Sequence, residues 1–133
     1  MIYGIGHDLV ETSRIKNSIE SLGDRFKNKI YTDVEKEYCQ QFKLNDYLHY
    51  AARFAAKEAF SKAIGTGLRD GFKFTEVGVV NQKSGQPKIV LTGSMLEKYG
   101  HLKSHLTMSH SNTNAVAVVI LEKVSETAKN IGE

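Results

Sequence analysis

The chain has 133 residues, 41% of them hydrophobic and 25% charged, which is ordinary for a single globular domain over residues 1–133. These values exclude collagen-like, repeat and largely disordered chains. The net charge of +3 permits an acidic protein partner but lacks the strong basic bias of nucleic-acid-binding proteins. Cys39 is the only cysteine, the N-terminus lacks the basic segment of a signal peptide, and no apolar run approaches the roughly 20 residues of a membrane span. We therefore expect a soluble, cytoplasmic protein that binds neither nucleic acid nor membrane.

The N-terminal residues predict a strand followed by a helix. Residues 1–9 are apolar and rich in β-forming side chains, which indicates a short, mostly buried strand that ends near Asp8. Ser13 is suited to cap the helix behind it. Four apolar residues then follow at helical spacing: Ile15, Ile19, Leu22 and Phe26.

Two further helices are predicted in the first half of the chain. Thr32 and Glu35 have the spacing of a capping box, in which each side chain bonds a free amide of the first helical turn. We expect this second helix to direct three side chains inward: Val34, Tyr38 and Phe42. A third helix should begin near residues 45–46 and run to Ile64, where Gly65 ends it in a left-handed conformation.

The C-terminal half predicts strands with one short helix between them. The expected strands cover residues 74–80, 88–92, 105–111 and 115–121, with turns at 81–87 and 112–114 and a short helix at 93–99. The last ten residues indicate a weak helix or a tail. The complete order, β-α-α-α-β-β-α-β-β, predicts an α+β fold in which a mainly antiparallel sheet packs against helices.

The third helix contains the densest motif of the chain, RFAAKEAFSKAIGTG at residues 53–67. At about 100° per residue, one side of this helix collects alanines and Leu48, and we expect that side to pack in the core. The other side mixes aromatic and polar residues: Tyr47, Tyr50, Phe54, Lys57, Glu58, Ser61, Lys62 and Gly65. We expect this second side to hold a ligand, because a solvated helix face seldom needs aromatic side chains.

Glu58 and Asp8 are candidate metal ligands. Glu58 precedes Lys62 by four residues, so this pair alone can be an ordinary surface ion pair. Asp8 ends a predicted strand, where an aspartate often forms a turn or caps a helix. Two carboxylates from different elements with a lysine nearby also suit Mg²⁺, which takes one or two protein carboxylates and completes its shell with water and substrate phosphate. The sequence leaves these alternatives open.

A glycine pattern and a histidine complete the candidates. Gly4 and Gly6 have the spacing of a dinucleotide-binding fingerprint, but Leu9 occupies the position of its third glycine, so that fold is not expected. His110 lies on the apolar side of its predicted strand and is either a core residue or a ligand contact. Its spacing from the other histidines fits no common zinc site.

Three segments, in this order, carry a resemblance to a known family: MIYGIGHDLVE at residues 1–11, RFAAKEAFSKAIGTG at 53–67 and MSHS at 108–111. Together they resemble the holo-[acyl-carrier-protein] synthase family, the small single-domain type of 4′-phosphopantetheinyl transferase. The resemblance covers nearly the whole chain, and the central motif is its most specific part. It implies an enzyme of fatty acid biosynthesis that uses Mg²⁺ to transfer the phosphopantetheine arm of coenzyme A to a serine of apo acyl carrier protein, with release of adenosine 3′,5′-bisphosphate.

The resemblance also implies roles for individual residues. Asp8 and Glu58 would hold Mg²⁺, and Lys62 would lie beside the pyrophosphate or assist proton transfer, so these three are the expected catalytic residues. Lys62 would also bind coenzyme A together with five further residues: Arg53, Ser61, Gly65, Pro87 and His110.

The same resemblance implies two kinds of partner. An acidic acyl carrier protein would dock on the basic first helix through Arg14, Ser21 and Arg25. The chain would form a homotrimer with active sites between adjacent subunits. His7 departs from the family, which more often has an aliphatic residue there; in a strand its side chain points away from that of Asp8.

Two other classes of protein are alternatives. A non-catalytic module that binds coenzyme A or a nucleotide would not need both Asp8 and Glu58. A small nucleic-acid-binding domain is disfavoured by the low net charge.

Overall fold

The computed structural model describes residues 1–125, and the predicted α+β class and element order are confirmed. The elements are β1 (Ile2–Glu11), α1 (Thr12–Leu22), α2 (Asp24–Ile30), α3 (Asp33–Gln40), α4 (Asp46–Ala63), the 3₁₀ turn η1 (Phe74–Glu76), β2 (Val77–Asn81), β3 (Pro87–Leu91), α5 (Gly93–Tyr99), β4 (Leu102–His110) and β5 (Asn114–Lys123). The prediction for the last ten residues lies largely outside the described residues. None of the described helices is long and apolar enough to cross a membrane.

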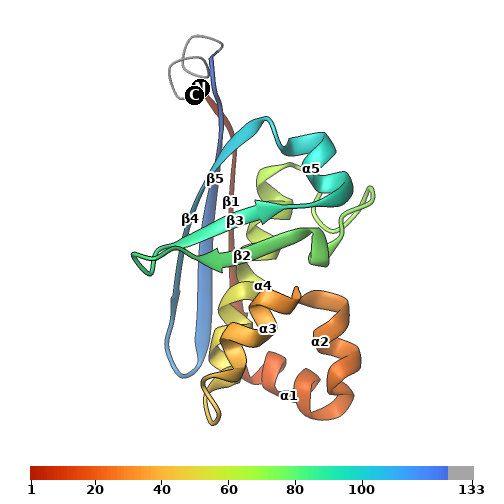
Figure 1. Ribbon diagram of the computed structural model, residues 1–133, viewed down its shortest axis with the longest axis vertical. Coiled ribbons are helices and arrows are strands. Elements are labelled where there is room, and N and C mark those ends of the chain that lie inside the picture. The colour runs from red at the N-terminus through yellow and green to blue at the C-terminus, as the bar shows by residue number, and fades with distance from the viewer. Residues whose placement is uncertain (126–133) are drawn as a thin grey trace.

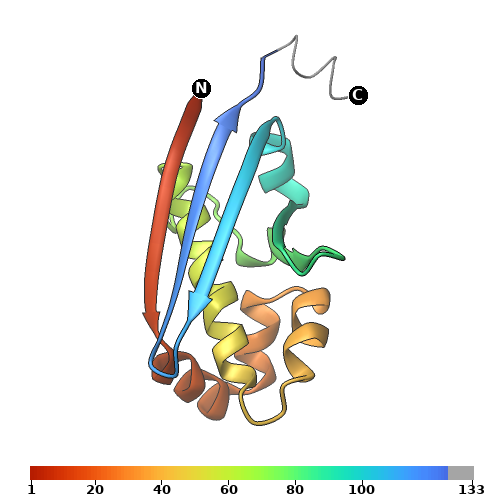
Figure 2. The same cartoon turned by 90° about the vertical axis from the view of Figure 1, so that its left-hand side faces the viewer.

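The strands pair antiparallel, as predicted, but they form two sheets rather than one. β1, β5 and β4 make a three-stranded sheet in that order, and β2 and β3 form a separate hairpin beside it (Figure 1). Helix α4 runs along one face of the three-stranded sheet, and α1, α2 and α3 gather around its first half (Figure 2). The core therefore lies between the sheet and α4.

β1 is longer than predicted and is only half-buried. Gly6, Asp8 and Val10 face α4 and are buried, whereas Ile5 and Leu9 are each 61% exposed on the outer face of the sheet. The alternation follows from the period of two in a strand, which places every second side chain on the face without a helix.

The first predicted helix is divided in two at Gly23. Gly23 has φ = 54°, a left-handed conformation that glycine adopts readily, and it ends α1. α1 begins at Thr12, so Ser13 is not its cap. The side chain of Leu22 is 47% exposed rather than directed inward. α1 ends at this residue, and Phe26, the next apolar residue of the predicted helix, belongs to α2.

The capping box of α3 is confirmed. Thr32 Oγ1 accepts a hydrogen bond from the Glu35 amide at 3.2 Å, and Glu35 Oε1 accepts one from the Thr32 amide at 2.8 Å. The prediction that Val34 points inward is wrong, since its side chain is 55% exposed. The fully buried position beside it belongs to Glu35.

α4 is buried on nearly all sides. Its alanine side packs in the core as predicted, and Gly65, with φ = 87°, follows its end. Four residues of the second side are buried: Tyr50, Phe54, Lys57 and Ser61. Between residues 54 and 63, only Glu58 and Lys62 have side chains open to solvent.

Candidate active site

Asp8, Glu58 and Lys62 meet where β1 crosses α4. Lys62 Nζ donates a hydrogen bond to Asp8 Oδ1 at 3.0 Å, so this lysine pairs with the aspartate rather than with Glu58. Burial, and then the neighbouring Asp8 carboxylate, raise the pKa of Glu58 to about 7. The two carboxylates proposed from the sequence are therefore close enough to repel each other.

This pair of carboxylates fits a divalent cation. Asp8 Oδ2 is buried and has no hydrogen-bond partner, which is unfavourable for a carboxylate oxygen. A cation between Asp8 and Glu58 would satisfy that oxygen and neutralise the repulsion, and oxygen ligands suit Mg²⁺. Within residues 1–125, no cluster of three or more acidic, histidine or cysteine side chains could hold a metal, so an ion here would take its other ligands from water or substrate.

A groove of about 380 Å³ connects Glu58 to the basic helices α1 and α2. Arg14 and Arg25 line it, and the Arg14 guanidinium also lies 5.7 Å from the centre of the Phe54 ring. Ser21 is exposed on α1 but does not line the groove. The rest of the lining is mostly apolar: Leu22, Phe26, Lys29, Ile30, Leu68 and Phe74. Leu68 and Phe74 follow α4 in segments without a recognisable site motif, so their place in the groove could not be predicted from the sequence.

A second pocket, of about 210 Å³, brings together three of the residues predicted to bind coenzyme A. They are Arg53, Pro87 and His110. The other lining residues are Tyr38, His49, Ala52, Asn81, Gly85 and Met108. This pocket shares no lining residue with the groove at Glu58. The predicted site residues of one chain are therefore divided between two places.

Arg53 is the charged residue in the wall of the second pocket. It is only 2% exposed, donates a hydrogen bond to Asn81 Oδ1 at 2.9 Å and stacks over the Tyr38 ring at 4.1 Å. Its Nε is buried without a partner. A positioned guanidinium with an unused donor suits an anionic ligand such as a phosphate.

His49 joins His110 in this pocket and was not among the residues predicted from the sequence. The two imidazole rings are 5.3 Å apart, and His49 stacks on Phe42 at 3.7 Å. Burial, followed by the charges of His110 and Arg53, lowers the pKa of His49. Its position one helical turn before Arg53 was the available signal in the sequence. His110 itself is exposed rather than a core residue.

Ser61 and Gly65 line neither pocket. The Ser61 hydroxyl is buried and donates a hydrogen bond to the Glu58 carbonyl oxygen at 2.6 Å, within α4 itself. Gly65 is exposed just beyond Lys62. Their roles toward coenzyme A stay predictions from the resemblance.

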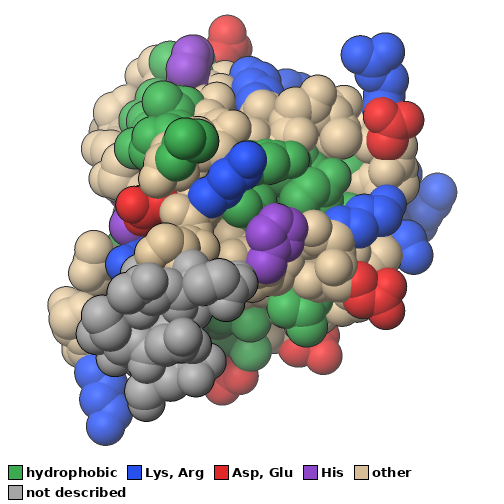
Figure 3. Space-filling view, turned by 90° about the horizontal axis from the view of Figure 1, so that it is seen from above, with side chains coloured by type: hydrophobic (Ala, Val, Ile, Leu, Met, Phe, Trp, Pro, Cys, Tyr) green, Lys and Arg blue, Asp and Glu red, His purple; other side chains and the backbone are tan. Residues whose placement is uncertain are grey.

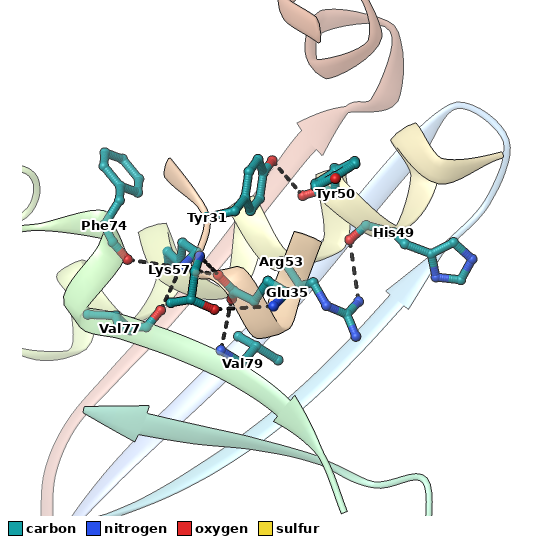
Figure 4. Close-up of polar contacts among 10 residues, drawn as sticks. Tyr31, Glu35, His49, Tyr50, Arg53, Lys57, Phe74, Val77 and Val79 are labelled. Carbon is teal, nitrogen blue, oxygen red and sulfur yellow. Dashed lines mark hydrogen bonds and ion pairs between the residues drawn. The ribbon is translucent and has the colours of Figure 1, made fainter. Parts of the chain in front are cut away.

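Lys57, beside Glu58 in the central motif, is the centre of a buried polar network. Its Nζ lies 2.8 Å from Glu35 Oε1 and donates hydrogen bonds to the carbonyl oxygens of Phe74 and Val77 at 2.9 and 2.7 Å (Figure 4). Glu35 Oε2 also accepts a hydrogen bond from the Val79 amide at 2.8 Å. The network joins α3, α4, η1 and β2.

Known proteins share this sequence and arrangement. The family model of the 4′-phosphopantetheinyl transferase superfamily matches residues 4–119. A holo-[acyl-carrier-protein] synthase of Koribacter versatilis is 46% identical over 125 residues, which cover 92% of this chain and 99% of that protein. The chain therefore belongs to the 4′-phosphopantetheinyl transferase superfamily and, within it, to the holo-[acyl-carrier-protein] synthase family.

Solved structures confirm the fold. The holo-[acyl-carrier-protein] synthase of Neisseria meningitidis matches with a TM-score of 0.82 and 36% identity, covering 92% of this chain and 100% of that chain. The enzyme of Bacillus anthracis, solved in complex with coenzyme A (3′,5′-ADP), matches with a TM-score of 0.80 and 36% identity, covering 93% and 99%.

Proposed function

We propose that this protein transfers the 4′-phosphopantetheine group of coenzyme A to a serine of apo acyl carrier protein, in the cytoplasm and in support of fatty acid biosynthesis. The observation that carries the proposal is the meeting of Asp8, Glu58 and Lys62, because Glu58 also lines a groove together with the basic residues of α1 and α2. The relatives named above are holo-[acyl-carrier-protein] synthases, and one was solved with coenzyme A.

The residues at this point suit phosphoryl transfer. Asp8 and Glu58 would hold Mg²⁺, which when bound would neutralise charge on the pyrophosphate. Lys62, half-exposed beside Asp8, would place a second positive charge against a phosphate oxygen. The serine oxygen forms a bond to the phosphorus that carries pantetheine, the bond from that phosphorus to the departing adenosine 3′,5′-bisphosphate breaks, and the hydroxyl proton passes to an acceptor at the site.

The groove indicates where the carrier protein would dock. Arg14 and Arg25 are exposed on α1 and α2 and lead to Glu58, and Ser21 lies on the same α1 helix. Positive side chains here would attract an acidic carrier and orient its serine arm toward the carboxylates.

The second pocket supports an active site built from two chains. Arg53, Pro87 and His110 would bind coenzyme A, yet they lie in a pocket separate from Glu58. We therefore propose a homotrimer in which one subunit supplies the carboxylates and its neighbour supplies this pocket.

The outer face of the three-stranded sheet supports this assembly. It carries exposed apolar side chains of β1 and β5: Ile5, Leu9, Val116 and Val118. In Figure 2 no helix lies in front of this face. Figure 3 views the molecule from above, where hydrophobic side chains also reach the surface between charged ones. Exposed apolar patches on a protein commonly mark contacts with another protein. His7 projects from the same face, opposite Val118 of β5.

Intact-mass measurement of an apo acyl carrier protein tests the function. After incubation with this protein, coenzyme A and Mg²⁺, the carrier should gain the mass of one phosphopantetheine group. A carrier in which alanine replaces the acceptor serine is the control. Glu58→Gln and Asp8→Asn should abolish the gain while circular dichroism shows an intact fold. An unmodified carrier after incubation with the native protein would refute the proposed function.

A further inference from the structure

The inner face of β1 has no side chain for most of the length along which it crosses α4. Gly4 and Gly6 occupy two successive inward positions, and Asp8 takes the next one. A Cβ atom added at Gly6 would overlap the carbonyl oxygen of Ala59 and lie 2.7 Å from the amide nitrogen of Ala63. A Cβ atom at Gly4 would overlap the carbonyl oxygen of Ala63. The strand backbone thus lies directly on the helix backbone.

This close approach needs glycine and nothing larger. The atoms that a Cβ would meet belong to the backbone of α4, so no side-chain rotation could make room for it. Glycine in a strand interior lowers stability through its conformational entropy and the lack of a side chain to pack. Neither glycine has a positive φ, so backbone conformation does not explain their presence.

The close approach of β1 to α4 determines how far the Asp8 side chain must extend to reach the groups on the helix. Asp8 is two residues from Gly6 on the same face, and Glu58 directly precedes Ala59, the residue against which Gly6 packs. The Asp8 carboxylate has only one methylene, yet its Oδ1 lies 3.0 Å from Lys62 Nζ, and Lys62 lies one helical turn after Glu58 on α4. A side chain of that length reaches this part of α4 only because β1 lies against the helix backbone.

We propose that Gly4 and Gly6 are positioning residues of the metal site: they set the separation between the Asp8 and Glu58 carboxylates. The inference rests on the proposed function, because it assumes that these carboxylates hold the divalent cation. Gly4 and Gly6 have the spacing of part of a dinucleotide-binding fingerprint, but here they face the backbone of α4. Their proposed role is therefore to position the carboxylates and not to bind a nucleotide.

Manganese binding tests the separation of the two carboxylates independently of catalytic turnover. Mn²⁺ serves as the probe, and electron paramagnetic resonance measures its dissociation constant in the full chain with coenzyme A present. Gly6→Ala should raise this constant by about tenfold or more, as is typical when groups that orient metal ligands are changed. Among residues 1–125, β1 pairs with β5 alone and forms the edge of its sheet, so an outward shift of β1 would disturb one strand pairing and the proposed subunit contact rather than the whole sheet.

Gly100→Ala is the matched control. A Cβ atom there would lie 2.5 Å from the Leu96 carbonyl oxygen, again a clash with helix backbone, but at the end of α5. This variant should lose stability and keep the native dissociation constant for Mn²⁺. The comparison separates loss of spacing from general destabilisation.

A longer carboxylate provides the sharper test. In the native background Asp8→Glu should weaken Mn²⁺ binding, because the narrow gap fits the shorter side chain. In the Gly6→Ala background the same change should strengthen binding, because the additional methylene spans the widened gap. A purely structural role of Gly6 would not reverse the effect of Asp8→Glu. If Gly6→Ala does not fold, the same pair of measurements is made with Gly4→Ala.

Two results would overturn the spacing proposal: native Mn²⁺ affinity in a folded Gly6→Ala protein, or the same effect of Asp8→Glu in both backgrounds. Failure of the proposed metal site itself would look different. In that case the native protein would bind Mn²⁺ no more tightly than Asp8→Asn does.

Discussion

Adjacent residues of the central motif have opposite environments. Glu58 borders the groove, whereas Lys57 is fully buried and pairs with a fully buried Glu35. Burial lowers the pKa of Lys57, and the charge and hydrogen bond of Glu35 oppose that effect. A charged pair without access to water tolerates the loss of neither partner, because the remaining charge has no compensation.

Lys57→Met should therefore lower the free energy of unfolding by about 3–5 kcal/mol, the loss typical of a buried ion pair with one partner removed. Urea unfolding followed by circular dichroism measures this change. Adding Glu35→Gln to Lys57→Met should recover part of the loss, because it removes the charge left without a partner. The recovery should be incomplete, since glutamine has a single carbonyl oxygen and can accept from the Thr32 amide or the Val79 amide but not from both. Strictly additive losses in the double variant would contradict a coupling between the two charges.

At the scale of elements, the sequence predicted where most helices and strands lie. It predicted less well which of their faces are buried. The capping residues Thr32 and Glu35 and the turn at 81–87 are local signals, and the structure confirms both. The faces of α4 depend on distant partners that local periodicity does not contain. Tyr50, for example, is buried because Tyr31 packs on it, with ring centres 4.7 Å apart. The break at Gly23 was missed because the apolar spacing continues across it.

The same limit applies to the candidate site. Asp8 and Glu58 could be proposed from residue type and resemblance, but their contact depends on how β1 lies on α4. The placement of Arg53 and His110 in a different pocket from Glu58 could not be predicted either. It depends on which side chains the fold brings together around each pocket.

Helix α1 permits a test of docking by charge. Arg14→Glu should raise the KM for acyl carrier protein several-fold and leave the KM for coenzyme A unchanged, because it places a negative charge beside an acidic partner. Lys16→Glu makes the same change of charge on α1, but Lys16 lies 5.2 Å from the Tyr47 ring and does not line the groove. Steady-state kinetics with both variants measures the difference. Equal KM values for the carrier in both variants would count against docking along the groove.

For the whole molecule, the proposed trimer makes each chain an incomplete enzyme. Glu58 and His110 would act together only across a subunit boundary, since they line different pockets of their own chain. Two inactive variants should then give active enzyme when mixed, provided that each carries its substitution in a different half of the site.

Mixing Glu58→Gln with His110→Ala should restore activity. If subunits exchange at random in an equal mixture, about a quarter of the sites combine two intact halves, and the rate should approach that fraction of native. The measurement is the transfer rate after joint unfolding and refolding. A mixture of Glu58→Gln with Asp8→Asn is the control and should stay inactive, because both changes fall in the same half. If the mixture of Glu58→Gln with His110→Ala were as inactive as this control mixture, an active site shared between subunits would be refuted.

The burial of α4 on nearly all sides has a consequence for enzyme engineering. The helix that presents Glu58 and Lys62 is also the one around which the chain packs, so randomising residues 51–63 would mostly yield proteins that do not fold. New carrier or acyl specificities are better sought on the surfaces that border the helix. The exposed faces of α1 and α2 and the turn between β2 and β3 are such surfaces, and their side chains can be varied in a library without disturbing the core.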